Sequence, residues 1–157
     1  MSKYCIDTSA LMDGWVRYYP RDIWPGLWTK LDMLIQEGRL FATEEVLREL
    51  KKKNDALHRW AKERKSMFRG IDEPVQSVVL EILAKHQNLI HANRGRSGAD
   101  PWVIALAKVE GGKVITGERK SGSLEKPKMP DVCEAVGVPW MTLVDLCREQ
   151  KWVFEAS

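Results

Sequence analysis

The sequence contains little of what marks disulfide-rich, secreted or membrane-spanning proteins. It has three cysteines, an odd number without CxxC spacing, so it indicates neither a disulfide framework nor a zinc knuckle. No apolar run approaches the roughly 18 residues that a membrane-spanning helix needs. The N-terminal residues lead directly into a strand-like segment, without the basic and apolar regions of a signal peptide. We therefore expect a cytoplasmic protein that does not contact a membrane.

Positive charge is modest overall but clustered. The 157 residues suit one domain, residues 1–157, and carry a net charge of +3. Any one basic cluster is most simply a solvated face, but basic clusters beside acidic residues favour a substrate with a phosphate backbone. The residues that we expect to contact such a substrate form three pairs: Lys51 and Lys52, Arg94 and Arg96, and Arg119 and Lys120.

Short apolar segments alternate with helical patterns along the chain. Strands are predicted at residues 3–6, 40–42, 113–116, 138–141 and 152–154. Helices are predicted at residues 11–19, 28–35, 44–50, 75–83, 100–109, 131–135 and 143–147, with Thr43 and Asp131 as N-caps. A further polar helix is predicted to follow residue 50 and to run through Arg59 and Trp60. The helix at 100–109 is apolar nearly all round, which indicates burial on most faces. The alternation predicts an α/β fold whose parallel sheet is covered by helices on both faces.

Three acidic residues are predicted at the carboxyl edge of this sheet, where ligands bind in open α/β folds. Asp7 ends the first strand, and Glu118 follows the strand at 113–116 after one glycine. Asp100 begins the buried helix whose far end leads into that strand, so its N-terminus lies at the same edge. We expect the three carboxylates to converge there from distant parts of the sequence.

A fourth acidic residue, Glu49, lies on the helix after Thr43. At about 100° per residue, Glu49 falls beside the apolar stripe of this helix, whereas Glu45 lies further toward solvent. Each acid has a plainer role when it is considered alone. Asp7 and Asp100 suit helix N-caps, and Glu49 and Glu118 suit a solvated helix and a loop. The set as a whole, with its positions at strand ends, favours a functional site.

Four clustered carboxylates repel one another and raise one another's pKa values unless a cation lies among them. Oxygen ligands with open positions suit Mg²⁺ or Mn²⁺, as one ion or two, rather than zinc. Such an ion activates a water and neutralises charge on a scissile phosphate. The three histidines have no second ligand at metal-binding spacing and are interpreted as surface or loop residues: His58, His86 and His91.

These segments resemble the motifs of the PIN-domain family, in the same order and spacing. Residues 4–11 are similar to the first strand of the family and its leading aspartate. Residues 45–50 are similar to the family's helix that carries the second acid. Residues 99–107 resemble the family's helix that carries the third acid. Residues 114–119 resemble the family's strand and the turn with the fourth acid. Residues 128–133 further resemble a bacterial PIN-like subgroup.

The resemblance implies a three-layer α/β/α sandwich, with Asp7, Glu49, Asp100 and Glu118 as catalytic metal ligands. It implies an endoribonuclease dependent on Mg²⁺ or Mn²⁺, often a VapC-like toxin that pairs with an antitoxin, and dimers are common in the family. Thr8 and Thr116 match hydroxyl residues that support the site. Glu118 departs from the family pattern, because the fourth acid is usually aspartate.

Seven tryptophans are many for a chain of this length. Most are expected in the core, but Trp15, Trp24 and Trp28 are candidates for an exposed apolar surface that binds an antitoxin or a second copy.

Two other functions stay open at this stage. A non-catalytic RNA- or protein-binding module on the same fold would keep the basic surface without needing all four acids. A receiver-type phosphoacceptor domain shares the parallel sheet and the acids at strand ends. That chemistry needs adjacent acids after the first strand, whereas Asp7 is followed by Thr8 and Ser9.

Overall fold

The computed structural model describes residues 1–87, 100–123, 125 and 127–155, and for Asp100 it describes the backbone alone. Within these residues, a five-stranded sheet has the order β3-β2-β1-β4-β5, and all paired strands are parallel. The strands are β1 (Tyr4–Ile6), β2 (Leu40–Thr43), β3 (Phe68–Arg69), β4 (Lys113–Ile115) and β5 (Trp140–Met141). Every residue of β1 and β2 is buried, as expected for strands covered on both faces.

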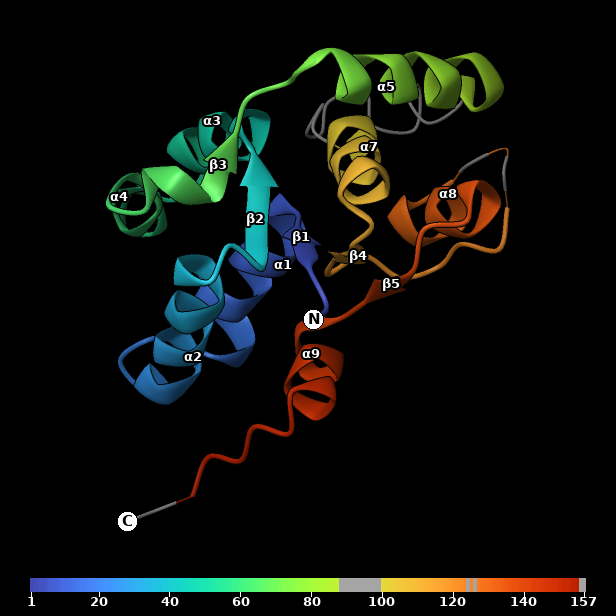
Figure 1. Ribbon diagram of the computed structural model, residues 1–157. Coiled ribbons are helices and arrows are strands. Elements are labelled where there is room, and N and C mark those ends of the chain that lie inside the picture. The colour runs from blue at the N-terminus through green and yellow to red at the C-terminus, as the bar shows by residue number, and fades with distance from the viewer. Residues whose placement is uncertain (88–99, 124, 126, 156–157) are drawn as a thin grey trace.

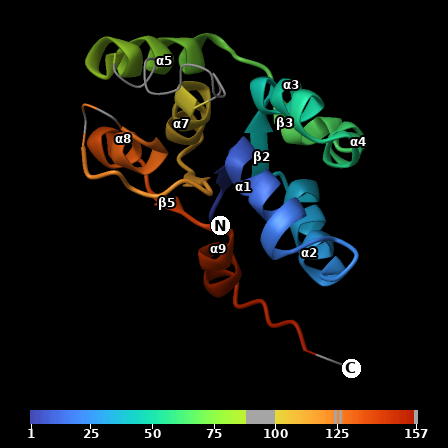
Figure 2. The same cartoon turned by 180° about the vertical axis from the view of Figure 1, so that it is seen from behind.

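Helices connect the strands and form two outer layers (Figures 1 and 2). From β1 to β3 the helical segments are α1 (Thr8–Met12), the π-helical η1 (Asp13–Tyr18), α2 (Pro25–Gln36), α3 (Glu44–Lys53), α4 (Asp55–Lys62) and the 3₁₀ turn η2 (Lys65–Met67). From β3 onward they are α5 (Glu73–Lys85), α7 (Asp100–Glu110), α8 (Met129–Val136) and α9 (Leu143–Glu149). Helices α1 and α2 lie on one side of the sheet, and α5, α7 and α8 lie on the other (Figures 1 and 2).

Local sequence explains the elements that position the site. The side chain of Thr43 accepts a hydrogen bond from the backbone N–H of Val46, which confirms the predicted N-cap of α3. Helix α7 packs against β1, β2 and β4, and its residues 103–107 are buried, as its apolar composition predicted. Within the described ranges, none of the helices is both long and apolar enough to cross a membrane.

Three predictions about elements need correction. The two-residue strand β3 was not predicted, because it is too short to carry a periodic pattern. The strand predicted at 152–154 is wrong, since the chain turns at Lys151, with φ of 59°, just after α9, and residues 152–154 form no strand. Phe154 instead packs its ring edge to face against Trp24. Asp131 occupies the third position of α8 rather than its N-cap, because the helix begins two residues earlier.

The tryptophan surface is also largely wrong. Trp28 is 1% exposed and lies in the core, where its ring packs against Trp15 and Trp60 at centroid distances of 5.0 and 5.1 Å. Trp15 is half-buried by these contacts. Of the three tryptophans proposed for an interface, Trp24 alone is exposed, at 39%.

Candidate functional site

The carboxyl ends of β1, β4 and β5 lie side by side and position the candidate site. The backbone N–H of Asp7 donates to the carbonyl of Ile115 at 2.9 Å, and that of Thr116 donates to Met141 at 2.9 Å. Asp7 is the first residue after β1 and the N-cap of α1. Asp7 and Thr116 therefore leave the sheet at adjacent positions, as the sequence predicted for its carboxyl edge.

The Asp7 carboxylate is held in one orientation. Its Oδ1 accepts hydrogen bonds from the Ser9 hydroxyl and the Ala10 backbone N–H, both at 2.8 Å. Its Oδ2 accepts from the hydroxyl of Thr116 at 2.5 Å. Because Asp7 is only 2% exposed, it has very little water to solvate its charge.

Burial raises the pKa of Asp7 to about 7, and the hydrogen bonds from Thr116, Ala10 and Ser9 offset only part of this rise. The negative charge of Glu118 raises the pKa further. None of these main influences is a cation. A carboxyl group with such a pKa at the carboxyl edge of a parallel sheet is typical of a functional site.

Ser9 and Gly117 join the β1 and β4 ends. The Ser9 hydroxyl oxygen accepts from the backbone N–H of Gly117 at 2.9 Å and lies 3.3 Å from the Thr116 hydroxyl. A Cβ at Gly117 would overlap the carboxylate of Asp13 and lie 3.0 Å from the Ser9 carbonyl oxygen. Glycine at this position thus lets the Asp13 carboxylate lie directly against the loop after β4.

The sequence analysis did not predict roles for Ser9 or Asp13. Ser9 carried a signal, because a serine two residues after an N-cap aspartate is within reach of its carboxylate. Asp13 carried none, because it begins the π-helical segment η1, where the rotation per residue differs from that of an α-helix.

Glu118, the predicted fourth acid, combines two functions. Its Oε2 accepts from the backbone N–H of Met129 at 2.8 Å, at the first residue of α8. Its own N–H donates to the Thr116 hydroxyl at 3.1 Å. The side chain therefore stabilises the start of α8 while its charge acts on Asp7.

The other two predicted acids lie on two different helices, α3 and α7. Glu49 is half-buried on α3, with its Oε2 atom shielded from solvent. Asp100 begins α7, but its side chain lies outside the described part of the chain. Among the described residues, no three Asp, Glu, His or Cys side chains form a group that could hold a metal ion. Because the Asp100 carboxylate is not among the described atoms, the complete four-acid site stays a prediction.

The two hydroxyl residues predicted to support the site differ. Thr116 is fully buried and donates directly to Asp7. Thr8 is 3% exposed, and its Oγ1 has no hydrogen-bond partner within the residues described. The hydroxyl beside Asp7 on α1 is that of Ser9 rather than Thr8.

The basic residues fall into three positions. Arg119 and Lys120 are exposed on the loop after β4, and the Nζ of Lys120 lies 2.6 Å from an oxygen of Glu134. Lys51 and Lys52 are exposed in the last turn of α3. The remaining predicted pair, Arg94 and Arg96, lies outside the described residues.

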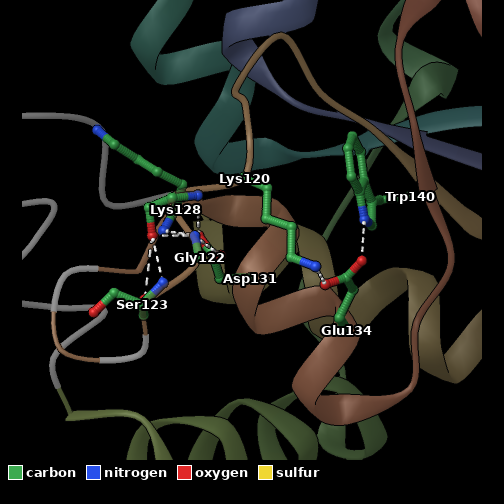
Figure 3. Close-up of polar contacts among 8 residues, drawn as sticks. Lys120, Gly122, Ser123, Lys128, Asp131, Glu134 and Trp140 are labelled. Carbon is green, nitrogen blue, oxygen red and sulfur yellow. Dashed lines mark hydrogen bonds and ion pairs between the residues drawn. The ribbon is translucent and has the colours of Figure 1, made fainter.

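Asp131 organises the loop that carries Arg119 and Lys120 (Figure 3). Its carboxylate accepts from the backbone N–H groups of Ser121, Gly122 and Lys128 at 2.8–2.9 Å, and from the Ser121 hydroxyl at 2.8 Å. Burial tends to raise the pKa of Asp131, but the hydrogen bonds together outweigh burial and lower the pKa to about 2. The ionised carboxylate thus fixes this loop against α8.

A cavity of about 440 Å³ opens beside the Asp7 cluster, that is, Asp7 with its hydrogen-bond donors Ser9, Ala10 and Thr116. Thr116 belongs to both, because it donates to Asp7 and also lines the cavity. The other lining residues come from α1, η1, the loop after β4, and the β5–α9 region: Ala10, Asp13, Tyr18, Tyr19, Gly117, Glu118, Arg119, Lys120, Trp140, Thr142, Leu143 and Val144. Acidic, aromatic and basic side chains therefore surround one opening at the carboxyl edge of the sheet.

Comparison with solved structures supports the fold. FitAcB from Neisseria gonorrhoeae aligns with 90% of this chain and 98% of its own, at 17% identity and a TM-score of 0.55. PAE2754 from Pyrobaculum aerophilum aligns with 96% of this chain and 97% of its own, at 15% identity and a TM-score of 0.46. The parallel sheet and the first likeness confirm the predicted α/β/α, PIN-like fold.

Sequence comparison places the chain in a family. No curated protein matches the sequence. Residues 4–154 match the sequence model of a family described as a domain of unknown function, DUF4411. The match includes all five strands of the described sheet and the site residues from Asp7 to Glu118. The chain therefore belongs to the DUF4411 family.

Proposed function

We propose that this protein is a metal-dependent endoribonuclease that hydrolyses phosphodiester bonds of RNA at the Asp7 edge of the sheet. The observation that carries the proposal is the buried Asp7 carboxylate, held by three hydrogen bonds but with a pKa raised to about 7. Its ionised form is poorly stabilised by the residues around it. A cation ligand supplies the missing stabilisation.

The proposed metal ligands are Asp7, Glu49 and Asp100, with Glu118 binding a second ion or positioning a water. Their oxygen donors fit Mg²⁺ or Mn²⁺. The Oδ1 atom of Asp7 accepts two hydrogen bonds, whereas Oδ2 accepts one and keeps a lone pair that is able to bind a cation. Such an ion supplies an activated water and neutralises charge on the cleaved phosphate.

The chain's own residues orient the reacting groups. Ser9 and Thr116 fix the direction of the Asp7 carboxylate from both sides. Arg119 and Lys120, exposed on the loop fixed by Asp131, bind the phosphate backbone in this proposal. Glu118 lines the cavity beside Thr116 and Arg119, and its negative charge acts on Asp7, so in this proposal it adds to the negative charge that a cation balances.

The proposed biological role is that of a cytoplasmic toxin restrained by an antitoxin protein. It rests on the resemblance to VapC-like PIN domains. A surface for a partner or for a second copy is available on the segment before α2, where Ile23 is 67% exposed and Trp24 is 39% exposed.

The test is cleavage of a labelled structured RNA by the purified protein in EDTA, Mg²⁺ or Mn²⁺. We expect cleavage with either metal, none in EDTA, and none with Asp7→Asn or Asp100→Asn. Asp55→Asn is the matched control, because Asp55 is an exposed acid on α4. Cleavage that persists in folded Asp7→Asn would contradict the assignment of Asp7.

A second candidate function is a non-catalytic module that binds RNA or protein. One observation favours it: the Glu118 carboxylate accepts a hydrogen bond from the backbone N–H of Met129 at the start of α8, which gives the predicted fourth acid a structural role. A calorimetric titration separates the two functions. Heat of binding at millimolar Mg²⁺ or Mn²⁺ that Asp7→Asn abolishes supports the enzyme, and its absence in the wild type supports the module.

A further inference from the structure

We propose that the cavity beside Asp7 binds one unpaired base of a single-stranded RNA, stacked on Tyr18 and Trp140, with Asp13 accepting a hydrogen bond from the base. This inference rests on the proposed ribonuclease function and specifies its substrate. A volume of about 440 Å³ lies within the range of small-molecule and cofactor sites.

The position of the cavity places a bound base next to the reacting group. Thr116 donates to the Asp7 carboxylate at 2.5 Å and lines the cavity with its neighbours Gly117 and Glu118. Ala10 also lines the cavity and donates to Asp7, so two residues contact both the cavity and the buried carboxylate. A base in the cavity would belong to a nucleotide adjacent to the cleaved phosphate.

The walls carry the aromatic surfaces that unpaired bases stack on. Tyr18 is 58% exposed at the end of η1, and Trp140 is half-buried on β5. The indole N–H of Trp140 points toward Glu134 on α8, at 3.5 Å, and Lys120 pairs with the same carboxylate (Figure 3). Glu134 therefore links an aromatic wall of the cavity to a cation at its rim.

The charges of the lining residues suit a base inside the cavity and a phosphate outside it. Asp13 and Glu118 both line it, and their negative charges repel a phosphate from the interior. A neutral ring with an exocyclic amino group suits the Asp13 carboxylate, because carboxylates accept hydrogen bonds from such groups. Arg119 and Lys120 line the same cavity and are exposed, so they suit the phosphate outside it.

A duplex does not fit this arrangement. The bases of an A-form helix are stacked and paired, and its deep major groove does not admit side chains, so stacking on Tyr18 and Trp140 requires an unpaired nucleotide. We therefore expect the cavity to select single-stranded loops or ends, with cytosine preferred over uracil because cytosine carries the amino group.

The test measures binding of labelled oligocytidine, oligouridine and a duplex RNA to protein that carries Asp7→Asn, which prevents cleavage. Tyr18→Ala and Trp140→Leu should each weaken oligocytidine binding about tenfold, the effect of losing one base–aromatic stack. Leu80→Ala, at a residue of α5 that is 68% exposed and does not line the cavity, should leave binding unchanged. Asp13→Asn should narrow the difference between oligocytidine and oligouridine.

The outcomes separate this inference from the proposed function. Tight RNA binding that Tyr18→Ala and Trp140→Leu leave unchanged overturns the base site and leaves the ribonuclease intact. An equal loss for duplex and single strand also overturns it. In the cleaving enzyme, Tyr18→Ala should raise KM with kcat nearly constant, and a folded wild type that neither binds nor cleaves RNA overturns both proposals.

Discussion

Asp7 and Asp131 are both buried aspartates, yet the fold treats their charges in opposite ways. They are 2% and 5% exposed, respectively. The described residues donate three hydrogen bonds to Asp7 and four to Asp131. The pKa of Asp7 is raised to about 7, whereas that of Asp131 is lowered to about 2. A small difference in accessible surface and one additional hydrogen bond do not by themselves explain why the two pKa values shift in opposite directions.

The surroundings and the donors explain it. Asp7 lies between strand ends under α1, deep among protein atoms, so loss of hydration dominates. Asp131 is covered by a loop at the surface of α8, whose donor residues Ser121 and Gly122 are themselves exposed. Three of its donors are backbone N–H groups with fixed direction, whereas Asp7 relies on two hydroxyls. The fold satisfies the charge of Asp131 but only partly offsets the loss of hydration at Asp7.

Asp7→Asn gives the largest expected change. Because the folded-state pKa is raised from the ordinary 3.8 to about 7, the folded protein holds the Asp7 proton more tightly than the unfolded chain. The free energy of unfolding in EDTA should therefore fall as pH rises from about 4 to 7, by up to about 4 kcal/mol from Asp7 alone. The Asn variant should lose this dependence, together with metal-dependent cleavage.

Urea denaturation at pH 5 and pH 8 measures this effect, with Asp55→Asn as the control for an exposed acid. Millimolar Mg²⁺ should restore the stability of the wild type at pH 8 and leave Asp7→Asn unchanged. Equal slopes of stability against pH in the two proteins would show that the ionised Asp7 is already satisfied, which would remove its contrast with Asp131.

Asp131→Asn tests a pH dependence of stability with the opposite sign: ionisation of Asp131 stabilises the fold, whereas ionisation of Asp7 destabilises it. The lowered pKa means that the carboxylate stabilises the fold above pH 4, and this contribution is lost as pH falls from about 4 toward 2. An amide accepts less strongly from the Ser121, Gly122 and Lys128 N–H groups, so we expect a loss of about 2 kcal/mol at pH 7. Thermal denaturation measures it, and an increase in stability would contradict the contrast.

The contrast marks what the sequence could and could not predict. The positions of Asp7 and Glu118 were predictable, because short apolar strands are recognisable and parallel strands end at one edge. The helix at Asp100 was predictable from its continuous apolar run. Asp13 was not, because its position depends on a π-helical segment and on a close approach to Gly117. Nor was the function of Asp131, which depends on how an irregular loop folds back onto α8.

Thr116→Val tests one donor of the Asp7 cluster with little change in shape. The variant removes the hydroxyl that donates to Asp7 at 2.5 Å in a fully buried position. The ionised carboxylate loses a hydrogen bond, so the pKa of Asp7 should rise further above 7. We expect a loss of about 1–2 kcal/mol at pH 8, a smaller loss at pH 5, and weaker cleavage. Equal losses at both pH values would mean that Thr116 acts through packing or through the hydrogen bond that it accepts from the Glu118 N–H, rather than through the charge of Asp7.

Thr8→Val is the matched change one residue after Asp7, and its expected effect is the smallest. Thr8 is 3% exposed, and its hydroxyl has no hydrogen-bond partner in the described part of the chain. Replacing an unsatisfied buried hydroxyl by a methyl group should raise the free energy of unfolding by about 0.5–1 kcal/mol. Cleavage should stay within about twofold of the wild type, because the site hydroxyls are those of Ser9 and Thr116. A tenfold fall in cleavage by an equally or more stable variant would instead assign the Thr8 hydroxyl to a ligand. Thr8 would then resemble Asp7 rather than Asp131, as a buried polar group that the fold alone leaves unsatisfied.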